Sequence, residues 1–130
     1  MVKAASKAKQ SFRPAAEDIT AEAIINGLQD KKAKDIVVLD LRHLNSSVAD
    51  MFIVCHGDSS THVDGLARSV EEIVEKMTGE SPTHVEGKQN AQWILLDYIN
   101  VVVHIFQSEQ RAYYGIERLW ADANIREIAN

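Results

Sequence analysis

Short runs of apolar residues alternate along the chain with longer segments in which apolar residues recur every three or four positions. Continuous short runs are typical of strands that are buried on both faces, and periodic segments are typical of amphipathic helices. The runs at residues 36–39 and 51–55 therefore predict two buried strands. Residues 42–50 between them are mostly polar and predict a turn.

Two segments have the spacing of helices. Residues 20–30 predict a first helix that starts at Thr20. Residues 59–79 have the stronger pattern, with a serine as the expected N-cap and Gly79 as the expected end. The apolar face expected for this second helix consists of Val63, Leu66, Ala67, Val70, Ile73, Val74 and Met77.

Residues 93–98 and 101–106 are rich in strand-forming side chains and are separated by only two residues. This arrangement predicts an antiparallel hairpin. Because side chains alternate between the two faces of a strand, the first run should divide between them. The two sets are Trp93, Leu95 and Asp97 on one face, and Ile94, Leu96 and Tyr98 on the other.

The C-terminal part of the chain predicts one more helix. Residues 109–120 place Tyr113, Ile116 and Trp120 at helical steps, so this helix is expected to pack against the sheet. Residues 123–130 follow it and are expected to fray.

A short strand at residues 82–87 completes the expected order of elements, which is α, β, β, α, β, β, β, α. This order predicts a mixed α/β (α+β) fold with about five strands in one sheet and helices flanking it. A chain of 130 residues suits one hydrophobic core rather than two. We therefore expect a single domain at residues 14–122, after a disordered basic tail at residues 1–13.

The net charge of the domain indicates what kind of partner it binds. Residues 14–130 carry 10 Lys and Arg against 19 Asp and Glu, a net charge of −9. Such a balance disfavours direct, sequence-specific binding of nucleic acid and suits a basic protein as partner. The apolar runs are also much shorter than the roughly 20 residues that cross a membrane. A lone cysteine, Cys55, fits a reducing compartment, so a cytoplasmic protein is expected.

The sequence offers few candidates for a cofactor or metal site. Residues 57–60 join a predicted strand to a helix and could hold an anion, but they match neither nucleotide-binding glycine pattern, so helix capping is the preferred interpretation. The five histidines lack the spacing of metal ligands. Cys55 lies in an apolar run, where a thiol is usually inert. We expect no cofactor and no metal.

Paired carboxylates are the remaining route to catalysis. Asp40 and Asp97 lie near strand ends, where a sheet could bring them together. A nucleotidyl-transfer site would instead use two aspartates one residue apart on a strand, and the sequence has no such pair. The protein is therefore expected not to be an enzyme.

Several segments together resemble one family, the ribosomal silencing factors, also called Iojap-like proteins. The similar segments are residues 35–42 (DIVVLDLR), 49–57 (ADMFIVCHG), 84–87 (HVEG), 93–98 (WILLDY), 101–106 (VVVHIF), 111–114 (RAYY) and 117–120 (ERLW). They cover the chain from about Thr20 to Asp122 in the order that the family has.

The resemblance implies a translation repressor. It implies binding to large-subunit ribosomal protein fourteen at the face where the small subunit docks, so that subunit joining is blocked when nutrients are limiting. It also implies a fold related to nucleotidyltransferases that lacks their catalytic aspartates.

The family's functional positions carry over to the hairpin and its surroundings. By the resemblance, Trp93, Asp97 and Tyr98 are expected to contact the partner, and Leu95 shares the face of Trp93. The expected neighbours of this contact are Glu86, His104, Arg111 and Tyr114.

Three alternatives stay open from the sequence. The same contact would serve a factor that assists assembly of the large subunit. A nucleotide-binding enzyme would use residues 57–60 with Asp40 and Asp97. An apolar sheet face away from the ribosome could also pair with itself in a homodimer.

Overall fold

The computed structural model describes residues 16–44 and 48–129, and in this part of the chain six strands form one sheet. Its helices are α1 (Ala16–Asp30), α2 (Ser60–Thr78), α3 (Ser108–Tyr114) and α4 (Ile116–Leu119), with a 3₁₀ turn, η1, at Arg42–Leu44. Its strands are β1 (Lys34–Asp40), β2 (Met51–Gly57), β3 (His84–Glu86), β4 (Trp93–Asp97), β5 (Val101–Gln107) and β6 (Asn124–Glu127).

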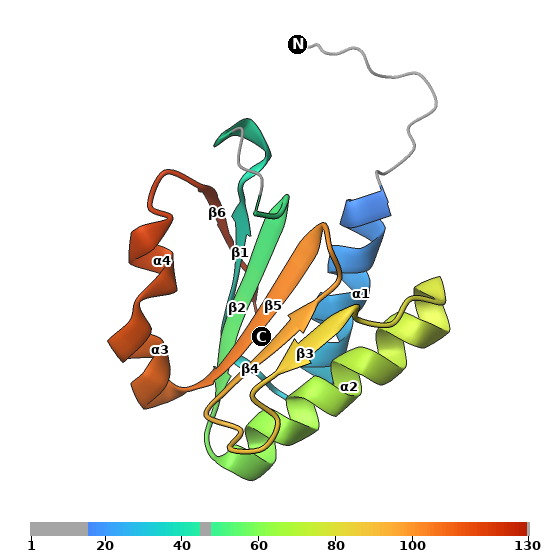
Figure 1. Cartoon of the computed structure of the whole chain (residues 1–130), viewed down its shortest axis with the longest axis vertical. Coiled ribbons are helices and arrows are strands. Elements are labelled where there is room, and N and C mark those ends of the chain that lie inside the picture. The colour runs from blue at the N-terminus through green and yellow to red at the C-terminus, as the bar shows by residue number, and fades with distance from the viewer. Residues whose placement is uncertain (1–15, 45–47, 130) are drawn as a thin grey trace.

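The sheet has the strand order β3-β4-β5-β2-β1-β6. Strands β2 and β5 run parallel, and the other neighbouring pairs are antiparallel. A parallel pair needs a long connection, which α2, β3 and β4 provide. Helices α1 and α2 lie against one side of the sheet, while α3 and α4 lie on the other (Figure 1). The expected single-domain, mixed α/β fold is confirmed.

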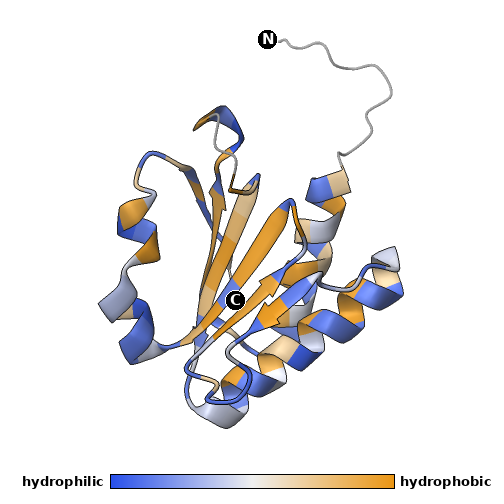
Figure 2. Cartoon of the chain, viewed as in Figure 1, coloured by the Kyte–Doolittle hydropathy of each residue, from blue (hydrophilic) through white to orange (hydrophobic). Residues whose placement is uncertain are grey.

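Both sides of the central strands are apolar, and the sheet is correspondingly hydrophobic along its length (Figure 2). We call the side under α1 and α2 the helix-covered face. Its sheet residues are Ile36, Val38, Met51, Ile53, Cys55, Ile94, Leu96, Val101, Val103 and Ile105. We call the opposite side the aromatic face. Its residues include Phe52, Trp93, Leu95, His104, Phe106 and Trp120.

The long helix α2 forms as its pattern predicts. The Ser59 hydroxyl accepts a hydrogen bond from the backbone N–H of His62 at 3.1 Å and caps the helix. Gly79 ends it with a φ of 79°, in the left-handed region that glycine adopts without strain. One expected core residue is wrong, because Met77 in the last turn is 52% exposed. Its sulfur lies beside α1, where it accepts from the side-chain amide of Asn26 at 3.8 Å.

The first helix starts earlier than expected. Helix α1 begins at Ala16 rather than at Thr20. The Thr20 hydroxyl hydrogen-bonds the carbonyl oxygen of Ala16 and the carboxylate of Glu80, so it sits inside the helix instead of capping it. The expected basic tail at residues 1–13 lies outside the described residues.

The C-terminal prediction is wrong in two respects. The helix expected over residues 109–120 is broken at Gly115, whose φ of 58° separates α3 from α4. Tyr113, expected in the core, is 80% exposed, and Tyr114 turns toward the sheet in its place. Residues 123–130, expected to fray, contain β6, which pairs with β1 and becomes the sixth strand. No helix in the described part of the chain is long and apolar enough to cross a membrane.

Candidate partner-binding face

The aromatic face is only partly covered where it approaches β3 and β4. Three side chains of β4, those of Trp93, Leu95 and Asp97, are half-buried on this face. The other side chains of the strand, Ile94 and Leu96, are fully buried under the helices. The alternation predicted from the sequence is therefore present, and the side that remains open is that of Trp93.

The Trp93 indole is held from several directions. Its ring stacks on Phe106 with centroids 4.9 Å apart and lies against Tyr114 of α3 at 4.7 Å. Its Nε1–H donates a hydrogen bond to Nδ1 of His104 at 3.1 Å. Ring contacts of this kind add stability beyond the area that they bury. The indole is thus a fixed, half-exposed apolar surface.

His104 supports this surface from beneath. The imidazole is 4% exposed, and burial lowers its pKa to about 4, so it is neutral at pH 7. Because Nδ1 accepts from Trp93, the proton of the neutral ring lies on Nε2, which has no hydrogen-bond partner among the described residues. Phe52 packs against the ring edge to face at 4.8 Å. His104 is therefore placed to orient Trp93 rather than to touch a partner.

Asp97 lies at the hairpin end of the open surface. Its Oδ1 accepts a hydrogen bond of 2.7 Å from the backbone N–H of Ile99, whose φ is 74°. The carboxylate therefore stabilises a turn in which a β-branched residue takes an unfavourable backbone conformation. Across the β3–β4 ladder, Asp97 pairs with His84.

Glu86 forms the outer rim. It is exposed at the end of β3, opposite Leu95, and its carboxylate contacts Nε2 of His84 at 2.6 Å. With Asp97, it places negative charge beside the apolar surface of Trp93 and Leu95. His84 was not among the predicted site residues, and only the strand register reveals that it shares this rim.

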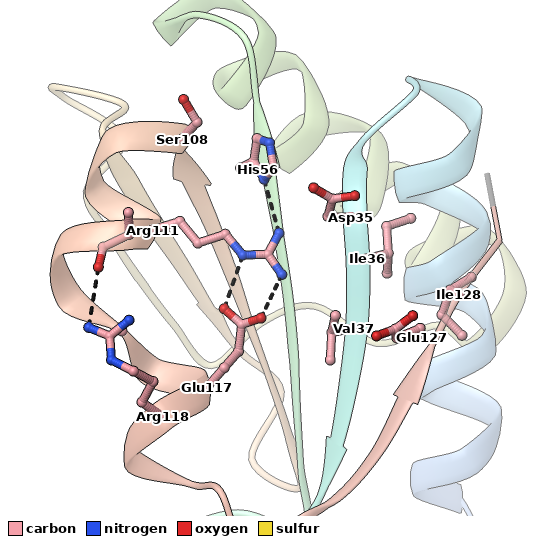
Figure 3. Close-up of a pocket in the computed structure, with 12 residues that line it drawn as sticks. Asp35, Ile36, Val37, His56, Ser108, Arg111, Glu117, Arg118, Glu127 and Ile128 are labelled. Carbon is pink, nitrogen blue, oxygen red and sulfur yellow. Dashed lines mark hydrogen bonds and ion pairs between the residues drawn. The ribbon is translucent and has the colours of Figure 1, made fainter.

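Besides His104, two predicted site residues are not on the open surface. Tyr98 is 7% exposed and belongs to the helix-covered core, where burial raises the pKa of its hydroxyl. Arg111 projects from α3 toward the end of β2, and its side chain is 11% exposed (Figure 3). Its guanidinium binds Glu117 in a two-pronged ion pair and donates to Nδ1 of His56. It lines a cavity of about 570 Å³ between α3, α4 and β1.

Tyr114 is the one predicted residue of α3 that reaches the open surface. It is 46% exposed and covers one side of the Trp93 indole. Tyr113 and Leu119, at 80% and 75%, are also exposed on the α3–α4 segment. Sequence reasoning placed Tyr113 in the core, since helical spacing alone does not show where Gly115 interrupts the helix.

The groups considered for catalysis do not assemble into a site. Asp40 lies on the helix-covered side of β1, with its carboxylate bound to Arg42, whereas Asp97 lies on the aromatic face. Ser59 is occupied as a helix cap. Cys55 is fully buried, and burial raises the pKa of its thiol to about 12. Among residues 16–44 and 48–129, no three His, Cys, Asp or Glu side chains are grouped as metal ligands.

Comparison with known proteins bears directly on this arrangement. A family model described as "Ribosomal silencing factor during starvation" matches residues 13–130. The chain belongs to the ribosomal silencing factor family. A ribosomal silencing factor from Halalkalibacterium halodurans is 38% identical over 104 residues, which are 80% of this chain and 87% of that protein.

Other similar proteins include a solved bacterial structure and a mitochondrial relative. A crystal structure of a protein from Chromobacterium violaceum has a TM-score of 0.76 and 33% identity, and covers 90% of this chain and 95% of its own. A mouse protein named for mitochondrial assembly of the ribosomal large subunit is 25% identical, over 83% of this chain and 50% of its own length. Both ribosomal regulation and ribosome assembly thus occur among the names of relatives in the silencing factor family.

Proposed function

We propose that this protein is a non-enzymatic repressor of translation that binds the large ribosomal subunit through the open part of its aromatic face. The observation that carries the proposal is the half-buried Trp93, stacked and hydrogen-bonded in one orientation beside Leu95. An aromatic ring that is already fixed loses little conformational freedom on binding. Rings of this kind are frequent energetic anchors of protein interfaces.

The partner in this proposal is large-subunit ribosomal protein fourteen, in the cytoplasm. Binding at the intersubunit face would leave no room for the small subunit, so translation would be repressed without any chemical step. Charge supports a basic partner, since residues 14–130 carry a net charge of −9. Asp97 and Glu86 place part of that charge at the edge of the apolar surface. The family's description connects it with starvation, which supports action under nutrient limitation.

The proposed contact residues follow from exposure. Trp93, Leu95 and Tyr114 supply the apolar centre, and Asp97 and Glu86 supply the acidic rim. Tyr98 is left out because it is buried on the opposite side of the sheet.

Co-sedimentation with purified large subunits tests the proposal. Wild-type protein should sediment with the subunits and reduce their joining to small subunits. Trp93→Ala should weaken binding about 30-fold, which corresponds to about 2 kcal/mol at an interface anchor. Met77→Ala is the control, because Met77 is an exposed apolar side chain at the end of α2, which lies on the helix-covered side of the sheet.

Thermal unfolding of both variants separates binding from folding. If Trp93→Ala lowers the midpoint so far that little folded protein remains, Trp93→Phe keeps an aromatic ring in the stack and removes the indole N–H together with part of the ring surface. Wild-type protein that neither sediments with large subunits nor reduces joining would contradict the proposed function.

A role in assembly of the large subunit is the second candidate, supported by the name of the mouse relative. The same surface would then act on a precursor particle. A deletion strain that accumulates immature large subunits during rapid growth would favour assembly. Normal maturation with unrestrained subunit joining in starved cells would favour repression.

A further inference from the structure

Helix α3 carries Tyr114, yet its seven residues have little to hold them in place. None of its residues is fully buried, and its N-cap residue, Gln107, makes no side-chain capping hydrogen bond. A helix of two turns is unstable without tertiary contacts. Its position over the sheet must therefore come from a small number of side-chain interactions.

Arg111 makes most of these interactions. It stands three residues before Tyr114, so the two side chains project from neighbouring positions on the helix. The guanidinium Nε and Nη2 bind the two carboxylate oxygens of Glu117 at 3.1 and 2.9 Å. Its Nη1 donates to Nδ1 of His56 at 3.0 Å and approaches the carbonyl oxygen of Lys34 at 3.4 Å. One side chain thus joins α3 to α4, β2 and β1.

Because of these contacts, few guanidinium N–H groups of Arg111 remain available to bind a partner. Its side chain is 89% buried, and its charge is compensated by Glu117 in the bidentate geometry that arginine favours. The close-up shows the guanidinium directed inward, between His56 and Glu117 (Figure 3). Tyr114 and Trp93, by contrast, are open to a partner.

We infer that Arg111 is a positioning residue: its clasp with Glu117 and His56 holds α3 so that Tyr114 stays packed against Trp93 in the docking surface. This inference rests on the proposed function and deepens it, because it assigns to Arg111 an effect on binding without contact. Lysine cannot replace it, since a single ammonium group cannot reproduce the two-pronged contact with Glu117 while reaching His56.

A double-mutant cycle with large subunits tests the inference. Arg111→Lys should weaken binding about fivefold, as loss of a preorganised contact would. Tyr114→Ala should weaken it by at least as much. If Arg111 acts through Tyr114, the double variant should bind no worse than Tyr114→Ala alone. Arg118→Lys is the matched control and should change binding less than twofold, because Arg118 makes only a 3.4 Å contact with the Ala112 carbonyl oxygen.

Glu117→Gln separates positioning from direct contact even if Arg111→Lys folds poorly. It keeps Arg111 and frees it from its ion pair. Positioning predicts weaker binding, whereas a direct contact of Arg111 with the partner predicts equal or stronger binding. In the free protein, the NMR resonance of the Trp93 indole N–H should shift in Arg111→Lys and Glu117→Gln but stay in place in Arg118→Lys.

The outcomes are distinct. Additive losses in the cycle, or a Trp93 resonance that stays in place, would overturn the positioning role. Unchanged affinity in Arg111→Lys would overturn it as well, provided that Tyr114→Ala weakens binding. If Trp93→Ala and Tyr114→Ala both bind normally, the failure lies with the proposed docking surface, and the resonance shifts still decide whether the clasp orients Tyr114.

Discussion

The two faces of the sheet are formed by the same strands but differ in their side chains and in how completely helices cover them. On the helix-covered face, aliphatic side chains such as Ile94, Leu96 and Val103 have no exposed surface. On the aromatic face, the rings of Trp93, Phe106 and His104 contact one another, and two short helices cover only part of them. Aliphatic packing closes a core completely, whereas stacked rings can hold a fixed shape and remain half-exposed.

Neighbouring residues of one strand are therefore expected to serve different functions. Side chains of β4 that point toward α1 and α2 should determine stability, and those that point the other way should determine binding. Substitutions on the two sides can therefore test the division, beginning with the side where the expected effect on stability is largest.

Truncation on the helix-covered face should have the greatest effect on stability. Leu96→Ala removes a fully buried side chain and should lower the free energy of unfolding by about 3 to 4 kcal/mol, through lost burial and the cavity that remains. Chemical denaturation measures this value. Folded Leu96→Ala protein should bind large subunits normally, and a selective loss of its binding would contradict the division between the faces.

Acidification should act on the aromatic face through His104. The unfolded chain binds a proton at this residue below pH of about 6.5, whereas folding lowers the pKa of His104 to about 4. Between these values the unfolded state binds more protons, so stability should fall as the pH decreases from 6.5 to 4, by up to about 3 kcal/mol. Above a pH of about 6.5, the contribution of neutral His104 to stability is fully present.

Comparison with His104→Gln isolates that contribution. Glutamine is uncharged throughout this pH range, and its carbonyl oxygen can accept from the Trp93 indole. The pH dependence of its unfolding free energy should therefore be shallower than that of wild type. Ser59→Ala removes no titratable group, so it is the control and should retain the wild-type slope. Equal slopes for wild type and His104→Gln would show that His104 is not buried in neutral form.

Removal of the cap on α2 should have the smallest effect. Ser59→Ala deletes the hydroxyl that accepts from the His62 backbone N–H and should cost about 1 kcal/mol of stability. Ser59→Asp should restore most of it, since aspartate is also a good N-cap. Because α2 covers only the helix-covered face, binding through Trp93 should be unaffected; a stronger effect on binding than on stability would argue that the faces are coupled.

Local patterns were sufficient where one periodicity extended through a whole element. The apolar steps of α2 and the paired runs of β4 and β5 predicted these elements because their side chains repeat with the period of the structure. The assignment of Trp93 and Leu95 to the face opposite Ile94 followed from the same rule.

Patterns failed where contacts distant in sequence decided the structure. Nothing in residues 124–127 predicts a strand, because all four side chains are exposed and the segment is ordered by backbone pairing with β1. The break at Gly115 and the turn of Tyr114 toward Trp93 depend likewise on the sheet beneath α3. The burial of Arg111 depends on Glu117 and His56, which approach it only in the folded chain.

By itself, the sequence determined the α/β class, the hairpin with its two alternating sides, and the resemblance to ribosomal silencing factors. These depend on residue order and short-range periodicity. Only the tertiary structure decided which side of β4 remains open, that Tyr98 is buried, and that Arg111 faces inward. Exposure is a property of the surrounding elements, and helices cover one side of this sheet more completely than the other.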